Sequence, residues 1–328
     1  MSPDLIAEFE QALRQWPVLV NEGLLADLKV ETVTWPLFAE HDVQVDILRA
    51  DQLHPQISGN KWFKLKYNLV AAQRQGCNRL LSFGGPWSNH LHALAYVSRL
   101  LGMSSHGIVP GDELDAQANP MLREAAEWGM ELEFVSRRQY RAWTQEGYGA
   151  TDAQTWLIPE GGDNEQGLLG CMSLVSPALW ASHEQQWDQI WLALGTGCTL
   201  AGVRLALPPS VRVRGVAVLA GDWPKQHMQK RLQQQGWHNT DNWDLLLNYH
   251  AGGYARVPPE LLSFIADFGD NTGVPLDPVY TGKAMQALCD QVRQGRVPAG
   301  TRVLFIHTGG LQGARGFSSS TGCVSSKG

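Results

Sequence analysis

Residues 191–202 have the sequence WLALGTGCTLAG, in which an apolar run passes through a glycine-rich turn into a helix-forming segment. The run at 189–194 is almost continuously apolar, as expected for a strand that is covered on both faces of a parallel sheet. Gly195 and Gly197 allow a tight turn, and free backbone N–H groups at the start of the following helix can bind an anion. The stretch therefore predicts an α/β sheet with a phosphate-binding loop at 195–199.

This loop differs from the common nucleotide-binding motifs. It lacks the GK[ST] of a Walker A loop, and Leu200 stands where a G-x-G-x-x-G fingerprint requires glycine. Because the loop contains no lysine, a single phosphate suits it better than a triphosphate. A purely structural strand-to-helix turn would give the same pattern, so other segments must decide between the two interpretations.

The same alternation extends over most of the chain. Further strands are predicted at 43–48, 79–83, 132–135, 213–218 and 303–306. Between them, apolar residues at helical spacing predict helices at 61–73 and 88–101. Strands that alternate with helices indicate an α/β fold with parallel sheets flanked by helices. At 328 residues, the chain is long enough for two domains.

Two more strand ends carry small polar residues. The segment SFGGPWSNH at 82–90 follows a strand and opens a helix, so Ser88 and Asn89 lie where a helix N-terminus can hold a carboxylate. A plain N-cap is the alternative for this segment. The strand that ends at residue 306 continues into HTGG, which contains Thr308. Because ligands of open α/β sheets bind beyond the carboxyl ends of strands, these segments and the loop predict one shared site.

Lysine chemistry is suggested by the segment ISGNKWFKL at 57–65. Ser58 and Asn60 are residue types that cap helices, which predicts a helix beginning at about Lys61. A lysine in the first helical turn faces the positive end of the helix dipole, at a cost of ~0.3–1 kcal/mol. The same field favours the neutral amine, the form that attacks an aldehyde. A surface lysine that is tolerated at this small cost is the alternative interpretation.

Two tyrosines, Tyr254 and Tyr280, stand in glycine-rich loops rather than on apolar stripes. A tyrosine hydroxyl with a shifted pKa can act as an acid or a base, although ordinary packing is the commoner role.

Composition excludes several classes of function. Hydrophobic residues make up 44% and charged residues 18% of the chain, and the net charge is −6, which excludes a disordered chain and gives no basic patch for nucleic acid. No apolar run reaches the ~18 residues of a membrane span, and the acidic, amphipathic N-terminus differs from a signal peptide. The five cysteines form no CxxC pair, which favours reduced thiols in a cytoplasmic protein. Without an H-E-x-x-H motif, no metal site is predicted.

Together, these segments resemble the 1-aminocyclopropane-1-carboxylate deaminase and D-cysteine desulfhydrase family. Its members are pyridoxal-phosphate (PLP) enzymes with the two-domain fold type II of the tryptophan synthase β-subunit. SGNKWFKL is similar to the family's lysine motif, GGPWSNH to its serine loop, GTGCT to its phosphate loop, DPVYTGKAM to its second-tyrosine segment and HTGG to its cofactor-ring segment. The likeness extends from about Val43 to Gly310.

The resemblance implies how the cofactor would be held. Lys61 would carry PLP as a Schiff base and act as a catalytic group. Asn89 would contact the ring hydroxyl, and Thr308 would neighbour the ring nitrogen. The phosphate would be held by the loop residues Gly195, Thr196, Gly197, Cys198 and Thr199.

The resemblance also implies which residues would meet the substrate. Ser88 and His90 would bind the substrate carboxylate or assist proton transfer, next to Asn89. Tyr254 and Tyr280 would flank the substrate as further catalytic groups. Pro86-Trp87 in the serine loop and the sequence LQGARGFSSS after Gly310 depart from the family's usual pattern, which leaves the substrate open.

By the same resemblance, we expect a homodimer in which residues 1–62 and 163–328 form a large PLP-binding domain and residues 63–162 a small domain. The expected reaction is α,β-elimination from a small amino acid, and D-cysteine would give pyruvate, sulfide and ammonia.

Two positions bear on the choice of substrate. Cyclopropane-opening members typically carry Glu after the second tyrosine and Leu in an HLGG segment, whereas this chain has Thr281 and Thr308. These residues favour the D-cysteine reaction. The alternatives are 1-aminocyclopropane-1-carboxylate deaminase activity, a non-catalytic PLP-binding protein, and a PLP-independent protein that binds a phosphorylated metabolite.

Overall fold

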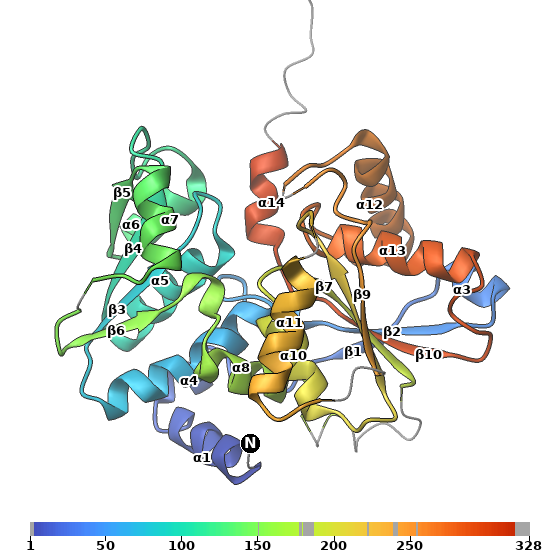
Figure 1. Ribbon diagram of the computed structural model, residues 1–328, viewed down its shortest axis with the longest axis horizontal. Helices are drawn as coiled ribbons and strands as arrows, with labels where there is room; N and C mark the ends of the chain where they lie inside the picture. Colours follow the sequence, from blue (N-terminus) through green and yellow to red (C-terminus); the bar gives the residue numbers. More distant parts are fainter. Residues whose placement is uncertain are drawn as a thin grey trace, which may run out of the picture.

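The computed structural model describes residues 3–149, 151–176, 179, 187–221, 223–238, 242–253 and 255–318. Within these residues the chain forms two sheets, each covered by helices on both faces (Figure 1). Nearly all neighbouring strands are parallel, and the predicted α/β fold is confirmed.

The larger sheet has six strands in the order β1-β2-β10-β7-β8-β9. Their bounds are Val30–Thr32 (β1), Gln44–Leu48 (β2), Gln189–Leu194 (β7), Arg212–Ala217 (β8), Trp243–Leu246 (β9) and Arg302–Ile306 (β10). Only β1 and β2 pair in antiparallel fashion. Strand β10, which comes late in the sequence, lies near the centre of the sheet between β2 and β7.

Strand β7 shows why this sheet needs an almost continuous apolar sequence. Ile190 and Leu192 pack into one hydrophobic core, together with helix α10 (Cys198–Ala206). The intervening Trp191 packs into the opposite core, together with helix α13 (Thr281–Arg293). Successive side chains of a strand point to opposite faces of the sheet. Because helices cover both faces here, polar residues cannot alternate with apolar ones along the strand.

Helices complete the larger part of the molecule. Helix α13 lies on one face of the sheet and is packed by α3 (Pro36–Glu40) and α12 (Pro259–Thr272). On the other face, α10 contacts α8 (Glu165–Met172) and α11 (Trp223–Gln234).

The smaller sheet has four parallel strands in the order β5-β4-β3-β6. Their bounds are Arg79–Phe83 (β3), Ser104–Pro110 (β4), Met130–Val135 (β5) and Thr155–Ile158 (β6). Helices α5 (Asn89–Leu101) and α6 (Pro120–Glu127) cover one face, and α7 (Arg137–Gln145) covers the other.

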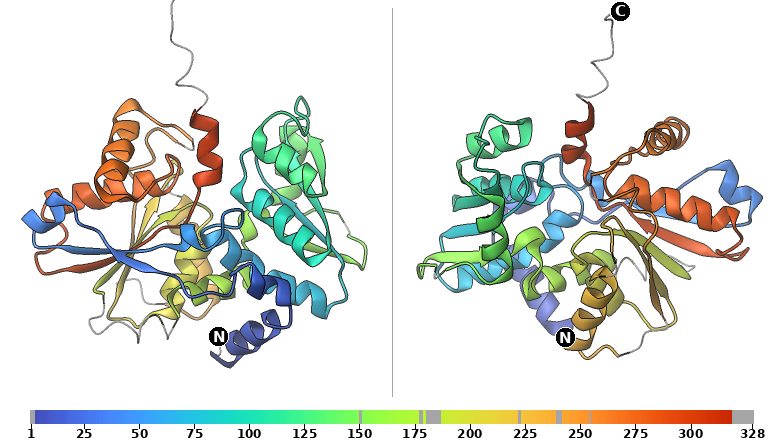
Figure 2. Two further views of the ribbon diagram at one scale, coloured as in Figure 1. Left: turned by 180° about the vertical axis from the view of Figure 1, so that it is seen from behind. Right: turned by 45° about the horizontal axis from the view of Figure 1, so that its top comes forward.

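Two groups of helices connect the sheets. Helix α4 (Asn60–Arg74) lies between the two sheets and packs against α8. Helix α1 (Pro3–Leu13) packs on α4, and α2 (Pro17–Asn21) packs against α5. Helix α14 (Leu311–Ser318) follows the larger sheet and lies between the two parts in both figures (Figures 1 and 2). Arg315 of α14 bonds to both carboxylate oxygens of Glu124 on α6, at 2.6 and 2.8 Å, and so ties α14 to the smaller part.

The predicted strands at 79–83 and 189–194 have the observed bounds, and the other four differ by one or two residues at their ends. Strands β1, β4, β6 and β9 were not predicted. The smaller sheet is built from residues 79–158, inside the small domain expected at 63–162, and those domain boundaries stay a prediction.

Candidate active site

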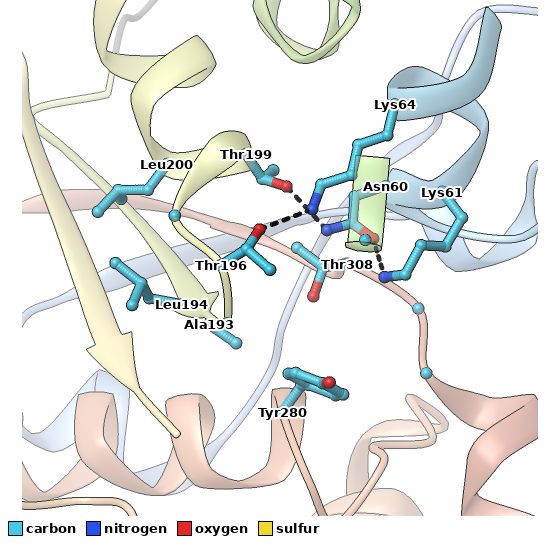
Figure 3. A pocket seen from close by; sticks show the side chains of 15 residues that line it. Asn60, Lys61, Lys64, Ala193, Leu194, Thr196, Thr199, Leu200, Tyr280 and Thr308 are labelled. Atoms are coloured by element: carbon cyan, nitrogen blue, oxygen red, sulfur yellow. Dashed lines mark hydrogen bonds between the residues drawn. The ribbon is translucent and has the colours of Figure 1, made fainter. Parts of the chain in front are cut away.

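A cavity lies where the carboxyl ends of β7 and β10 meet the start of α4 (Figure 3). This lysine cavity has about 550 Å³ of empty space, part of it open to solvent. Its lining comes mainly from the strand-end and lysine segments that the sequence analysis singled out. The lining residues are Asn60, Lys61, Lys64, Gly161, Ala193, Leu194, Gly195, Thr196, Gly197, Thr199, Leu200, Tyr280, Thr308, Gly309 and Gly310.

Lys61 lies in the first turn of α4, and its side chain extends toward this cavity. Its Nζ donates a hydrogen bond to Asn60 Oδ1 at 2.6 Å and lies 5.9 Å from the centre of the Tyr280 ring. Burial, assisted by repulsion from Lys64, lowers the pKa of Lys61 to about 7, although the charge of Asp277 acts in the opposite direction. At neutral pH much of the side chain is therefore the uncharged amine, which is the nucleophilic form.

The start of α4 depends on Gly59 rather than on the predicted capping side chains. Gly59 is the N-cap, with φ of +66°, and no side chain caps the helix. A Cβ at this position would lie 2.1 Å from the carbonyl oxygen of Thr308, so only glycine allows the two segments to meet. Asn60 N also donates to this carbonyl, at 3.2 Å, while Ser58 Oγ bonds to α14 instead. The predicted capping role of Ser58 and Asn60 was wrong.

The loop at 195–199 turns tightly into the N-terminus of α10. Gly197 has φ of +96°, and a Cβ there would lie 3.0 Å from the sulfur of Met228. The Thr199 hydroxyl accepts a hydrogen bond from Asn60 Nδ2 at 2.8 Å, which joins the loop to α4. Because the first N–H groups of a helix have no acceptor within the helix, this end of α10 can bind an anion.

Lys64 is a site residue that the sequence analysis missed. Its side chain is 5% exposed, and its Nζ donates to Thr196 Oγ1 at 3.3 Å. It supplies the positive charge that the loop itself lacks. The available signal was the spacing, because residues i and i+3 share a helix face, so Lys61 and Lys64 point to the same side of α4.

A second cavity adjoins the lysine cavity at Tyr280 and Gly310, which line both. It has about 780 Å³ of empty space and is bounded on one side by α14. Asn89 lines this second cavity, and its Oδ1 accepts a hydrogen bond from Gly313 N at 3.0 Å. Tyr254, the other tyrosine of the sequence analysis, lies outside the described residues.

Ser88 and Cys198 line neither cavity. Ser88 is the N-cap of α5, and its Oγ accepts a hydrogen bond from Leu91 N at 3.2 Å. Cys198 is fully buried behind the loop, where its thiol lies 3.6 Å from the carbonyl oxygen of Gly162. Only the backbone of Cys198 is therefore placed to contribute to an anion site.

His90 also lies behind the cavities, in a buried position. Burial, followed by the charges of Lys64 and Lys61, lowers the pKa of His90 to about 3, so the ring is neutral at physiological pH. His90 Nε2 lies 2.9 Å from Ser82 Oγ. Because that hydroxyl donates its hydrogen to the carbonyl of Ile158, Nε2 must carry the ring proton.

The two threonines that bear on substrate choice have different positions. Thr308 lines the lysine cavity, whereas Thr281 does not. The Thr281 side chain is fully buried, and its hydroxyl bonds to Asp277 Oδ1 at 2.8 Å. Any influence of Thr281 on a ligand is therefore indirect.

Membrane-spanning and metal-binding features are absent from the described residues. Across the described ranges, none of the helices combines the length and apolar character needed to cross a membrane. Nor do the described His, Cys, Asp and Glu residues form a group of three that could bind a metal ion.

The geometry of the lysine cavity fits a phosphorylated aldehyde. An uncharged lysine amine can attack an aldehyde carbon, and the helix N-terminus with Lys64 can bind a phosphate. Asn60 links these two features, because its amide bonds to Lys61 at one end and to Thr199 at the other.

Comparison with known proteins agrees with this chemistry. Residues 32–309 match the family described as pyridoxal-phosphate dependent enzyme. A putative 1-aminocyclopropane-1-carboxylate deaminase of Pyrococcus horikoshii is 29% identical over 306 residues, which cover 87% of this chain and 92% of the relative. A bifunctional D-cysteine desulfhydrase/1-aminocyclopropane-1-carboxylate deaminase of Arabidopsis thaliana is 30% identical over 295 residues, which cover 81% and 72%.

Solved structures give the same assignment. The crystal structure of a 1-aminocyclopropane-1-carboxylate deaminase homologue superposes with a TM-score of 0.77 at 26% identity, over 93% of this chain and 97% of the homologue. Threonine deaminase of Solanum lycopersicum shares the fold, with a TM-score of 0.62 at 12% identity, over 98% of this chain and 90% of the other. The chain therefore belongs to the family of pyridoxal-phosphate dependent enzymes with fold type II, and its cofactor is PLP.

Proposed function

We propose that this enzyme catalyses α,β-elimination from a small amino acid, with D-cysteine as the first candidate substrate. The observation that carries the proposal is the half-buried Lys61 amine, whose pKa of about 7 leaves it reactive beside Tyr280. With one molecule of water, D-cysteine would give pyruvate, sulfide and ammonia. The name of the Arabidopsis relative includes this activity beside 1-aminocyclopropane-1-carboxylate deaminase.

In the proposed arrangement, Lys61 would hold the aldehyde carbon of PLP. The hydroxyls of Thr196 and Thr199 and the backbone N–H groups of the loop would hold the phosphate, and Lys64 would balance its charge. Thr308 would serve the ring nitrogen, and Asn89 the ring hydroxyl. Bound PLP supplies an acceptor for the electrons that are released when a bond at the substrate Cα breaks.

Proton transfer is assigned to Lys61 Nζ. A pKa near 7 allows this amine to accept a proton and to return it at neutral pH. The hydroxyl of Tyr280 is proposed to assist on the substrate side, and Tyr254 keeps the same role as a prediction. The N-terminus of α5, with Ser88 and Asn89, is proposed to bind the substrate carboxylate.

His90 receives a supporting role in this proposal. Its neutral ring and its buried bond to Ser82 favour a contribution to the packing behind Lys64 over a contact with substrate.

A comparison of two substrates tests the proposed reaction. Thr308 lines the lysine cavity, and its hydroxyl could donate a hydrogen bond to the ring nitrogen of PLP. Cyclopropane-opening members typically carry leucine at this position, which has no donor, so Thr308 favours D-cysteine as the substrate. On one preparation, kcat/KM is measured for D-cysteine and for 1-aminocyclopropane-1-carboxylate through keto acid and ammonia release. A preference for the cyclopropane substrate would replace the proposed activity by ring opening. A yellow protein without turnover on a panel of D- and L-amino acids would indicate a non-catalytic PLP-binding protein.

We also infer a homodimer in the cytoplasm. The dimer rests on the family resemblance, and light scattering that gives the mass of one chain would reject it. The cytoplasmic location is supported by the unpaired thiols of Cys77, Cys171, Cys198 and Cys289, which suit a reducing compartment.

A further inference from the structure

The second cavity continues directly from the lysine cavity. Tyr280 and Gly310 form the boundary between them, and Lys61 Nζ lies 5.9 Å from the centre of the Tyr280 ring. A substrate whose Cα lies at Lys61 therefore has its side chain close to this boundary. The second cavity has about 780 Å³ of empty space beyond this boundary, part of it open to solvent.

The walls of the second cavity are largely aromatic and aliphatic. Trp87, from the loop before α5, and Phe317, from α14, are half-buried, and Val279 adds an aliphatic contact. Gly316 allows α14 to lie close to Trp87, because a Cβ at 316 would lie 3.0 Å from the indole ring. Trp87 and Phe317 both belong to segments that depart from the usual family sequence.

The carboxylate and the amide oxygen that line this cavity already have partners within the protein. Asp277 accepts four hydrogen bonds from donors on residues 279–281, at 2.8 to 2.9 Å. Asn89 Oδ1 accepts the N–H of Gly313 at 3.0 Å. Acceptors that are satisfied in this way offer little to a hydrogen-bond donor on the substrate side chain, so beyond Cβ apolar contact with the rings decides what binds.

We propose that the second cavity binds an apolar, preferably aromatic, group that the substrate carries beyond Cβ. The inference rests on the proposed function, because it takes Lys61 as the centre at which the substrate Cα–H bond breaks. D-Cysteine has only a thiol beyond Cβ and leaves this cavity unfilled. A cysteine whose sulfur carries an aryl or arylmethyl group would fill it.

S-Benzylcysteine illustrates the reaction. Its Cα–H proton passes to Lys61 Nζ, the Cβ–S bond breaks, and the electron pair of that bond leaves with sulfur. The thiolate takes up a proton, and water releases the remaining carbon skeleton as pyruvate and ammonia. The balance is S-benzylcysteine plus water to pyruvate, ammonia and phenylmethanethiol, and no oxidant is required.

Matched substrates test the inference on the holoenzyme. S-Benzylcysteine and S-methylcysteine, each as D- and L-enantiomers, are compared through pyruvate release, with D-cysteine alongside. Both are thioethers, so their difference reports the group on sulfur. In the enantiomer that reacts, we expect kcat/KM to be about tenfold or more higher for the benzyl compound, mainly through a lower KM. Equal values, or a preference for methyl, would overturn the inference.

A binding measurement separates this inference from the proposed reaction. Phenylalanine and alanine have no leaving group at Cβ, so their affinities, measured by calorimetry for both enantiomers, do not depend on elimination. About tenfold tighter binding of phenylalanine is expected, and equal affinities would count against the aromatic cavity. Pyruvate release from none of the cysteine compounds, with phenylalanine still preferred, would reject the proposed function and leave the cavity assignment standing.

Two variants assign the effect to the cavity walls. Trp87→Ala and Phe317→Ala should each reduce the benzyl-to-methyl ratio of kcat/KM several-fold. Trp143→Ala is the matched control, because Trp143 packs against Tyr148, 5.0 Å between ring centres, on the α7 side of the smaller sheet. This control should keep the wild-type ratio. If one wall variant fails to fold, the other still decides, and an unchanged ratio would overturn the assignment.

Discussion

Lys61 Nζ donates a hydrogen bond to the side chain of its sequence neighbour Asn60, at 2.6 Å. The opposite end of the same amide donates to Thr199 Oγ1 at 2.8 Å. One side chain therefore sets the direction of the amine and joins it to the anion-binding loop. This double role makes Asn60 a positioning residue for Lys61.

Asn60→Asp should slow the reaction of the apoprotein with PLP at neutral pH. A carboxylate beside Lys61 favours the ammonium form and raises the lysine pKa, so less uncharged amine is present at pH 7. The rate of appearance of the yellow form, measured by stopped flow between pH 6 and 10, should recover at higher pH than in the wild type. Asn60→Ala, which adds no charge, should slow the reaction with a smaller shift of the pH midpoint. Identical pH profiles for Asn60→Asp and wild type would contradict this role.

Lys61→Ala and Lys64→Met should have different effects on the cofactor. After borohydride reduction, mass spectrometry of the intact chain should show PLP attached to Lys64→Met but not to Lys61→Ala. Lys64→Met should bind PLP about 10–100-fold more weakly, because a hydrogen bond to a charged group contributes ~1.5–3 kcal/mol. A modified chain in Lys61→Ala would show that another lysine carries the cofactor.

Gly197→Asp should weaken PLP binding much more than it lowers the stability of the fold. The substitution places a negative charge next to the proposed phosphate site and strains a backbone with φ of +96°. Gly197→Ala carries the same backbone strain without the charge, so the difference between the two variants isolates the electrostatic effect. PLP affinity by fluorescence titration should fall further in the aspartate variant. Equal affinities would place the phosphate elsewhere.

The stability of the apoprotein should rise with pH through Lys61. The pKa of this lysine is about 7 in the folded protein, against an ordinary value of 10.5. Between these values the unfolded chain binds more protons at Lys61 than the folded chain does, so the free energy of unfolding increases with pH. Below about pH 7 both states are protonated and this contribution is constant.

Urea unfolding of wild-type and Lys61→Met apoproteins between pH 7 and 10 measures this effect. Other buried lysines titrate in both proteins, so the difference in slope belongs to Lys61. The variant should show the smaller increase. Equal pH slopes of the unfolding free energy in the two proteins would mean that folding does not lower the pKa of Lys61.

The bounds of strands 79–83 and 189–194 could be predicted, because both faces of these strands are buried and their apolar runs are nearly continuous. Strand β4 escaped prediction because Ser104, Ser105 and His106 interrupt the pattern. The His106 ring lies 3.1 Å from a carboxylate oxygen of Glu133 on the neighbouring β5. A contact between polar side chains of two different strands leaves no pattern of apolar residues in the sequence of either strand.

The same limit applies to the site. Segments at strand ends could be placed together, since the carboxyl ends of parallel strands share one edge of a sheet. The contact between Lys64 and Thr196 could not be predicted in this way, because it depends on how α4 packs against the larger sheet. Nor does sequence distinguish an exposed from a buried side chain at the start of a helix. His90 was placed among the substrate residues, although it is buried.

The position of β10 between β2 and β7 has a consequence for synthesis on the ribosome. The smaller sheet is complete once residue 158 has emerged, whereas β2 must wait for residues 302–306 before it gains its parallel neighbour. At ~5–20 residues per second, this delay is on the order of tens of seconds, during which the larger part exposes an unpaired strand edge. A nascent chain halted before β10 would thus carry a finished smaller sheet and Lys61, but lack the HTGG segment that closes the site. Chaperone protection during this interval matters most for the open edges of β2 and β7, because β10 is the strand that joins them.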